Sequence, residues 1–237
     1  MSNRLRTTSP CDATARQYPH PHRDRADAMP LSSLAFASCF AYSPRGAGWL
    51  AGASRQICER VKRIDPHWLP RYAGVVYRMS MRDPQLAALF AHGAVLVPVP
   101  GSTATSDAPW AALQLAIALS QVGLALPVWV GLRREFTVRK SARALSVLRP
   151  SVAEHYESFS VVRMGAPIRR VVLIDDVVTK GRTLFAAAAR LLTELPCADI
   201  RAFALLRTHG FVERLEQLNE SCHGVIRWSG GDTRRDP

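Results

Sequence analysis

The fold is decided by one stretch of the 237-residue chain, Val171-Val-Leu-Ile-Asp-Asp-Val-Val-Thr-Lys-Gly-Arg-Thr-Leu184. Its first four residues are apolar and too few for a helix, so they predict a buried strand. Two acids, Asp175 and Asp176, end that strand, and a short loop with Gly181 leads into an apolar helix expected over residues 182–195. In a parallel sheet, such a strand end is where ligands bind.

Each part of this stretch has a chemical use. Backbone N–H groups at the start of a helix have no partner within it, so the loop at residues 179–183 can cradle an anion. Gly181 lets the backbone approach a phosphate closely, and the hydroxyl groups of Thr179 and Thr183 add donors. The acid pair suits hydrogen bonds from two vicinal hydroxyls, such as those of a ribose. The stretch therefore predicts a sugar phosphate as ligand.

The stretch resembles the phosphoribosyl-pyrophosphate (PRPP) motif of type I phosphoribosyltransferases, in which apolar residues and two acids precede a loop rich in threonine and glycine. The resemblance implies that Asp175 and Asp176 hold the ribose. It matches the 5′-phosphate loop to Thr179, Lys180, Gly181, Arg182 and Thr183. Lys180 and Arg182 depart from the common pattern, which has Thr and a small residue there. We expect the loop to tolerate both, because its binding relies on backbone N–H groups.

Two further segments resemble parts of the same family. Val97-Pro-Val-Pro-Gly-Ser102 resembles the pyrophosphate-binding loop after an early strand, and its matching residues are Pro100, Gly101 and Ser102. The basic segment at residues 132–149 stands where the family has a flexible catalytic loop. There the resemblance implies that Lys140 and Arg149 bring positive charge to the leaving pyrophosphate. A basic, solvated surface loop is the alternative for this segment.

The run from Arg149 to Val161 resembles the ComF-like, competence-associated branch of the family, in which an arginine precedes a Phe-x-Val strand. His155 is a candidate substrate contact there, and a structural histidine is the alternative. ComF-like proteins usually begin with a four-cysteine zinc module. This chain has only isolated Cys39 and Cys58 in that region, so we expect a branch without the zinc module and no metal-ligating residues.

Strands and helices alternate through the C-terminal two-thirds, which predicts an α/β domain with a mainly parallel central sheet flanked by helices. The resemblance implies the type I phosphoribosyltransferase fold with a small N-terminal hood. We expect a disordered tail over residues 1–30, the hood over residues 31–70, the phosphoribosyltransferase domain over residues 71–225 and a flexible C-terminal tail over residues 226–237. One hypothesis is that Met29, which precedes the first stretch typical of folded protein, is the true start.

The composition narrows the function classes. A net charge of +12 attracts phosphates, of which nucleic acid is only one source. No apolar run approaches the roughly 20 residues of a membrane helix, so we expect a soluble protein without a membrane partner. The five cysteines are dispersed, odd in number and without a C-x-x-C pair, which argues against a disulfide framework and favours reduced thiols in the cytoplasm. The common nucleotide loops, G-x-x-x-x-G-K-[ST] and G-x-G-x-x-G, are absent.

Together, the motifs predict a phosphoribosyltransferase that binds PRPP and transfers its phosphoribosyl group to a nitrogen acceptor, releasing pyrophosphate. Mg²⁺ is the expected cofactor, bound mainly through PRPP itself. The alternative is a non-catalytic PRPP-binding regulator, or a nucleic-acid-associated protein of the same fold. The resemblance is also compatible with a homodimer.

Overall fold

The computed structural model describes residues 29–104, 108–124, 126–139, 149–163, 165, 167–210 and 214–237. Of the tail expected over residues 1–30, only residues 29 and 30 are among the described residues. The catalytic candidate Lys140 lies outside them. In chain order the elements are β1 (Ser33–Tyr42), α1 (Gly48–Lys62), α2 (Leu69–Ser80), α3 (Pro84–Leu89), β2 (Ala94–Pro98), α4 (Ala111–Leu119), the π-helical turn η1 (Ser120–Leu124), β3 (Leu132–Arg134), α5 (Val152–Ser158), β4 (Phe159–Val161), β5 (Arg170–Val178), α6 (Arg182–Glu194), β6 (Asp199–Thr208), β7 (Asn219–Ser229) and β8 (Asp232–Asp236).

Six of the strands form one mixed sheet in the order β2-β5-β6-β1-β7-β8, and β3 pairs with β4 in a separate small sheet. The first four strands of the large sheet run parallel. β7 pairs antiparallel with β1, and β8 pairs antiparallel with β7. The α/β class, with a mostly parallel sheet between helices, is therefore confirmed.

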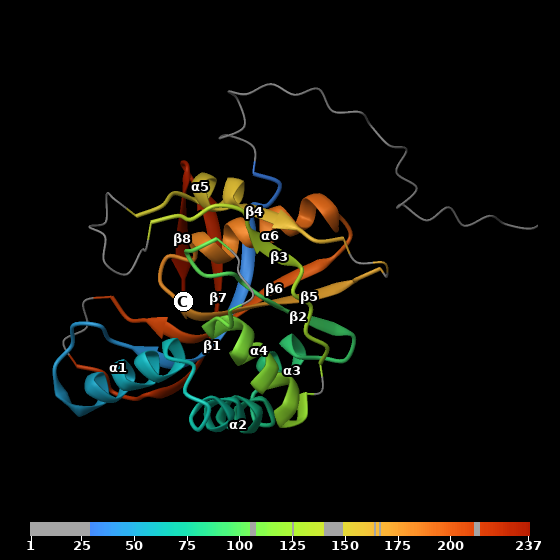
Figure 1. Cartoon of the computed structure of the whole chain (residues 1–237). Coiled ribbons are helices and arrows are strands. Elements are labelled where there is room, and N and C mark those ends of the chain that lie inside the picture. The colour runs from blue at the N-terminus through green and yellow to red at the C-terminus, as the bar shows by residue number, and fades with distance from the viewer. Residues whose placement is uncertain are drawn as a thin grey trace, which may run out of the picture.

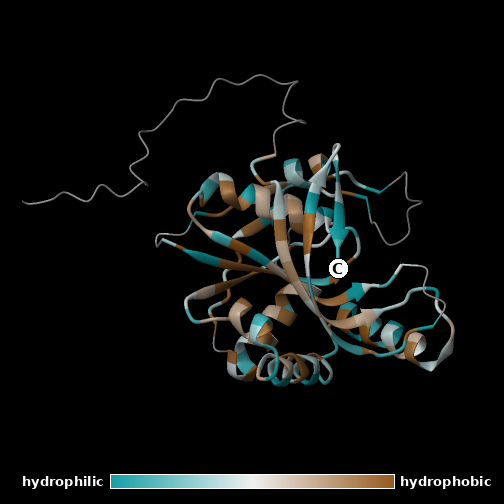
Figure 2. Cartoon of the chain, turned by 180° about the vertical axis from the view of Figure 1, so that it is seen from behind, coloured by the Kyte–Doolittle hydropathy of each residue, from teal (hydrophilic) through white to brown (hydrophobic). Residues whose placement is uncertain are grey.

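Helices cover both faces of the sheet, with α1 to α4 on one face and α5 and α6 on the other (Figure 1). Alternate residues of β5 face the two layers: Val172 and Ile174 pack toward the first, and Val171 and Leu173 toward the second. Burial on both faces explains why β5 is apolar without interruption from Val171 to Ile174. In the hydropathy view, tan and brown predominate along the inner strands of the sheet (Figure 2). No helix among the described residues is both long and apolar enough to cross a membrane.

The structure corrects the expected hood. Residues 33–42 form β1, an inner strand of the main sheet that pairs with β6 on one side and β7 on the other. Its run from Leu34 to Ala41 is apolar apart from Ser38 and almost wholly buried, as in strands covered on both faces. A hood over residues 31–70 is therefore wrong for this strand, and the sheet extends across the expected boundary at residue 70.

The structure also corrects the flexible C-terminal tail. Residues 226–237 contain the end of β7 and the whole of β8, joined as a hairpin by Gly230 and Gly231. Both glycines have positive φ, as a two-residue hairpin turn between paired Ser229 and Asp232 requires. Ile226 is fully buried in the layer formed with α6, so the hairpin is anchored to the core.

One carboxylate ties α3 to the sheet. Oδ1 of Asp83 accepts hydrogen bonds from the amides of Gln85 and Leu86, which caps the helix. Oδ2 accepts from the Ser221 hydroxyl and lies 2.7 Å from Nε2 of His223, both on β7. Burial raises the pKa of Asp83, but these hydrogen bonds outweigh burial and lower the pKa to about 2. The carboxylate is therefore ionised at neutral pH and holds two elements together.

Replacing Asp83 with alanine should lower the free energy of unfolding by about 1–2 kcal/mol, because the cap and the contacts to β7 are lost together. Urea denaturation measures this change. The control is Glu157→Ala, which removes a carboxylate from an exposed position on α5 and should change stability by less than about 0.5 kcal/mol. Equal effects of the two substitutions would contradict the assigned role of Asp83.

Candidate functional site

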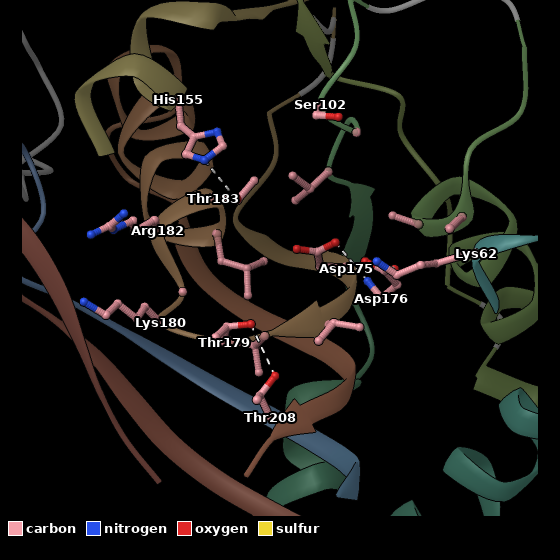
Figure 3. A pocket seen from close by; sticks show the side chains of 18 of the residues that line it. Lys62, Ser102, His155, Asp175, Asp176, Thr179, Lys180, Arg182, Thr183 and Thr208 are labelled. Atoms are coloured by element: carbon pink, nitrogen blue, oxygen red, sulfur yellow. Dashed lines mark hydrogen bonds and ion pairs between the residues drawn. The ribbon is translucent and has the colours of Figure 1, made fainter. Parts of the chain in front are cut away.

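A cavity of about 650 Å³ lies at the carboxyl ends of β2 and β5. It collects segments that are far apart in the chain: the loops after β2 and β5, the C-terminal half of α1, and side chains from β3 and α5 (Figure 3). The sequence-predicted site residues that the structure describes all line it: Pro100, Gly101, Ser102, Arg149, Asp175, Asp176, Thr179, Lys180, Gly181, Arg182 and Thr183. Lys140 lies outside the described residues.

The loop after β5 presents unpaired backbone donors to this cavity. Gly181 adopts a left-handed conformation with φ of 82° and precedes the first turn of α6, where no side chain caps the helix. The amides of residues 180–183 donate no hydrogen bond to any other described residue. Amides at a helix start that face a cavity attract an anion, through their own donors and through the helix dipole.

The acid pair lies at the end of β5, beside this loop. The Asp176 amide donates to Oδ1 of Asp175 at 2.9 Å. Burial and the neighbouring carboxylate of Asp176 raise the pKa of Asp175 well above its ordinary value. The pair therefore resists carrying two negative charges unless a cation or hydrogen-bond donor approaches it.

Lys62, at the end of α1, is a site residue that sequence reasoning missed. Its Nζ lies 3.6 Å from Oδ2 of Asp176 (Figure 3). Burial lowers the pKa of Lys62, but the carboxylates of Asp176 and Asp175 outweigh burial and raise it. No local pattern identifies this lysine, because the contact joins residues more than a hundred positions apart.

Arg134 brings positive charge beneath the loop at residues 100–102. This nearly fully buried side chain donates to the carbonyl of Gly101 and to the hydroxyl of Ser158, and its guanidinium lies 4.2 Å from the ring centre of Phe159. Burial lowers the pKa of Arg134 to about 10, so it remains charged at neutral pH. A buried cation that grips the loop's backbone both shapes the loop and attracts an anion to it.

His155 connects the two loops. Its Nδ1 lies 3.5 Å from Nη2 of Arg134, and its Nε2 lies 3.4 Å from Oγ1 of Thr183. Burial and the charge of Arg134 lower the pKa of His155 to about 4, so the ring is neutral at physiological pH. A guanidinium can only donate, so Nδ1 is the acceptor and Nε2 carries the hydrogen. The Thr183 hydroxyl can then accept from His155 and donate its own hydrogen into the cavity.

Lys180 and Arg182, which depart from the motif that the loop resembles, extend away from the acid pair (Figure 3). Both make ion pairs with Asp232 on β8. Both residues line the cavity, while their side chains pair with Asp232 of the C-terminal hairpin.

The side chains at the site can be compared with the ligands that Mg²⁺ prefers. Among the described residues, no group of three or more His, Cys, Asp or Glu side chains is arranged to hold a metal ion. Two adjacent carboxylates suit a Mg²⁺ ion that takes most of its oxygen ligands from a bound substrate and water.

No protein-family model matches the chain, and no curated protein matches it. The function must therefore be argued from the geometry of the site.

Replacing Gly181 with alanine should destabilise both the fold and the anion site. The left-handed conformation costs an L-residue about 1–2 kcal/mol. The added Cβ would also lie 2.4 Å from Cδ1 of Ile226, and overpacking of this kind costs about 1–3 kcal/mol. Urea denaturation should show a loss of at least about 2 kcal/mol.

The control for this substitution is Gly210→Ala. Gly210 is exposed, has no positive φ, and has open space where a Cβ would lie. Its replacement should change stability by no more than about 0.5 kcal/mol. A Gly181→Ala variant as stable as this control would contradict the described loop conformation.

His155 should make the protein less stable in mild acid. The unfolded chain takes up a proton on this histidine below about pH 6.5, whereas the folded state does so only near pH 4. The free energy of unfolding should therefore fall as the pH is lowered from about 6.5 towards 4, by up to about 1.4 kcal/mol per pH unit. Urea denaturation at several pH values should show a smaller slope for His155→Gln. An unchanged slope would show that the histidine is freely protonated in the fold.

Proposed function

We propose that this protein is a type I phosphoribosyltransferase that binds PRPP with Mg²⁺ and transfers the phosphoribosyl group to a nitrogen acceptor. One observation carries the proposal: residues 180–183, whose amides have no hydrogen-bond partner among the described residues, line one cavity together with the acid pair and the loop at residues 100–102. The first of these suits a terminal phosphate, the second a diol and the third a second anion. A phosphorylated ribose with a diphosphate at its other end requires this combination.

The roles divide along the cavity. The amides of residues 180–183 and the Thr183 hydroxyl would hold the 5′-phosphate. The carboxylates of Asp175 and Asp176 would accept hydrogen bonds from the ribose hydroxyls, and bound Mg²⁺ would neutralise diphosphate charge. The loop at residues 100–102 would hold the diphosphate, with the charge of Arg134 beneath it.

The reaction is a substitution at the anomeric carbon of the ribose. The acceptor nitrogen forms a bond to this carbon while the bond to the diphosphate oxygen breaks, and the electron pair leaves with pyrophosphate. The transition state has oxocarbenium character, so the protein contributes mainly positioning and charge stabilisation. Arg139 and Arg149 line the same cavity and, with Lys140, are the proposed cations for the leaving group.

The raised pKa of Asp175 fits this role. Burial and Asp176 oppose ionisation of Asp175, and Lys62 lies against the pair. Ribose hydroxyls that donate to the pair would favour its charged form.

Calorimetry with PRPP and Mg²⁺ tests the proposal. The wild type should bind, and a panel of nitrogen bases should include one that yields pyrophosphate. Asp175→Asn and Asp176→Asn should each weaken PRPP binding by about tenfold or more, because a hydrogen bond to a charged group contributes about 1.5–3 kcal/mol. The control is Asp199→Asn at the amino end of β6, opposite the cavity, where the carboxylate pairs with exposed arginines. That control should bind PRPP normally.

The outcomes separate the candidate functions. An absence of PRPP binding by the folded wild type would refute the proposal. Normal PRPP binding with no pyrophosphate from any acceptor would favour the non-catalytic regulator. Nucleic-acid binding that weakens steeply between low and moderate salt would favour the nucleic-acid-associated alternative, which the charge of +12 permits.

A further inference from the structure

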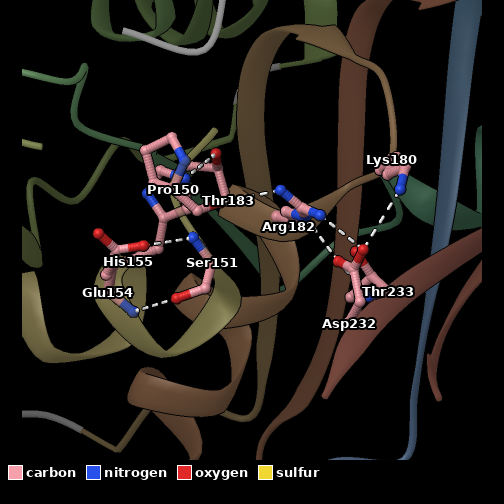
Figure 4. A network of polar contacts seen from close by, with 9 residues as sticks. All are labelled: Pro150, Ser151, Glu154, His155, Lys180, Arg182, Thr183, Asp232 and Thr233. Carbon is pink, nitrogen blue, oxygen red and sulfur yellow. Dashed lines mark hydrogen bonds and ion pairs between the residues drawn. The ribbon is translucent and has the colours of Figure 1, made fainter. Parts of the chain in front are cut away.

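Two cations that flank Gly181 converge on a single carboxylate of the C-terminal hairpin (Figure 4). Arg182 pairs with Asp232 in a bidentate manner, with Nε 2.5 Å from Oδ1 and Nη2 2.6 Å from Oδ2. Nζ of Lys180 lies 3.2 Å from Oδ2 of the same carboxylate. A bidentate pair fixes direction as well as distance, so the residues on both sides of the glycine are held.

The carboxylate is itself fixed in place. The Thr233 amide donates to Oδ1 of Asp232 at 2.7 Å. The hydrogen bond from Arg182 is the main cause that lowers the pKa of Asp232 to about 2, so the pair is charged throughout the neutral range. Arg182 also donates through Nη1 to the carbonyl of Pro150 at 3.2 Å, which links the contact to the residue after Arg149.

Two other residues of the hairpin contact the loop or the strand ends beside it. Arg235 on β8 donates to the carbonyl of Val178 at 3.1 Å and to that of Thr208 at 2.7 Å, at the ends of β5 and β6. Ile226 on β7 lies where a Cβ on Gly181 would be. The strand end before the loop, the glycine within it and the first residue of α6 are therefore all held by β7 and β8.

We infer that Asp232 is a positioning residue for the phosphate loop, and that through Arg182 and Lys180 it holds the amides of residues 180–183 in the arrangement that binds a sugar's terminal phosphate. The inference rests on the proposed function and adds a residue that no part of the loop motif contains. It also explains why the loop departs from the motif at two positions, since the side chains of Lys180 and Arg182 bind the hairpin through Asp232.

Charge and geometry predict opposite effects for the loss of this carboxylate. Removing a negative charge near an anion site should strengthen anion binding by simple electrostatics. Releasing the loop should weaken it, because amides that must be ordered on binding cost affinity. The sign of the change therefore distinguishes a positioning residue from a charge that merely tunes the local field.

The experiment compares two ligands that occupy different ends of the cavity. Ribose 5-phosphate carries the terminal phosphate without the diphosphate, and Mg²⁺-pyrophosphate carries the diphosphate alone. By calorimetry, Asp232→Asn should bind ribose 5-phosphate about tenfold more weakly, the equivalent of losing one charged hydrogen bond. Its affinity for Mg²⁺-pyrophosphate should stay within about twofold of wild type.

Asp236→Asn is the matched control. It removes a carboxylate from the same strand, where Asp236 pairs with Arg227 and Arg234, and it should leave both affinities unchanged. Arg182→Gln should reproduce the selective loss. The Arg182→Gln/Asp232→Asn double variant should be no weaker than either single variant, because all three break the same contact.

Three outcomes would overturn the inference: unchanged or tighter binding of ribose 5-phosphate by Asp232→Asn, an equal loss for both ligands, or additive losses in the double variant. An equal loss accompanied by a lower unfolding midpoint would identify a contact that only stabilises the fold. If wild type binds neither PRPP nor ribose 5-phosphate, the proposed function itself fails. If wild type binds ribose 5-phosphate and Asp232→Asn binds it equally well, only the inference about Asp232 fails.

Discussion

The site depends on one backbone constraint, which is the left-handed turn at Gly181. This turn redirects the chain from β5 into α6, and the amides of residues 180–183, which line the cavity, have no hydrogen-bond partner in the part of the chain that the structure describes. Unpaired donors are costly when they are buried away from water. Such a turn is therefore stable only where its amides can reach solvent or a ligand, as at this cavity. Ile226 occupies the space beside the turn, and a side chain at position 181 would have to displace it.

The charges around this turn explain how one cavity could hold both ends of a polyanion. The acid pair cannot readily carry two negative charges, because Asp175 lies partly buried beside Asp176, and Lys62 offsets what charge remains. Arg134 supplies a buried positive charge beneath the opposite loop. Burial, together with the charge of Arg134, keeps His155 neutral, with its Nε2 hydrogen directed to Thr183. Positive charge thus dominates where anions are expected, and negative charge is confined to the middle of the cavity.

Local patterns predicted the parts of the fold whose structure is decided locally. β5, its loop and α6 follow from an apolar run, two acids and a glycine, and β2 follows from a similar short run. β1 was missed as an inner strand because its apolar run alone does not say which sheet buries it. The hairpin of β7 and β8 was missed although Gly230-Gly231 is a turn signal, because the charged residues that follow are typical of a solvated tail. Lys62 and Asp232 were missed because each meets its partner only through the tertiary fold.

Lys180 and Arg182, which depart from the motif that the loop resembles, connect a loop that the sequence predicts with a hairpin that it does not. From the motif alone, we expect the loop to tolerate two cations, because its binding relies on backbone N–H groups. In the structure their side chains extend to Asp232, about fifty residues away in sequence, and leave the backbone of the loop to the cavity. A loop with long side chains at these positions needs an external partner to fix them, since their rotamer freedom would otherwise oppose an ordered backbone. The C-terminal hairpin is that partner, so the residues that depart most from the motif also connect the loop to the rest of the fold.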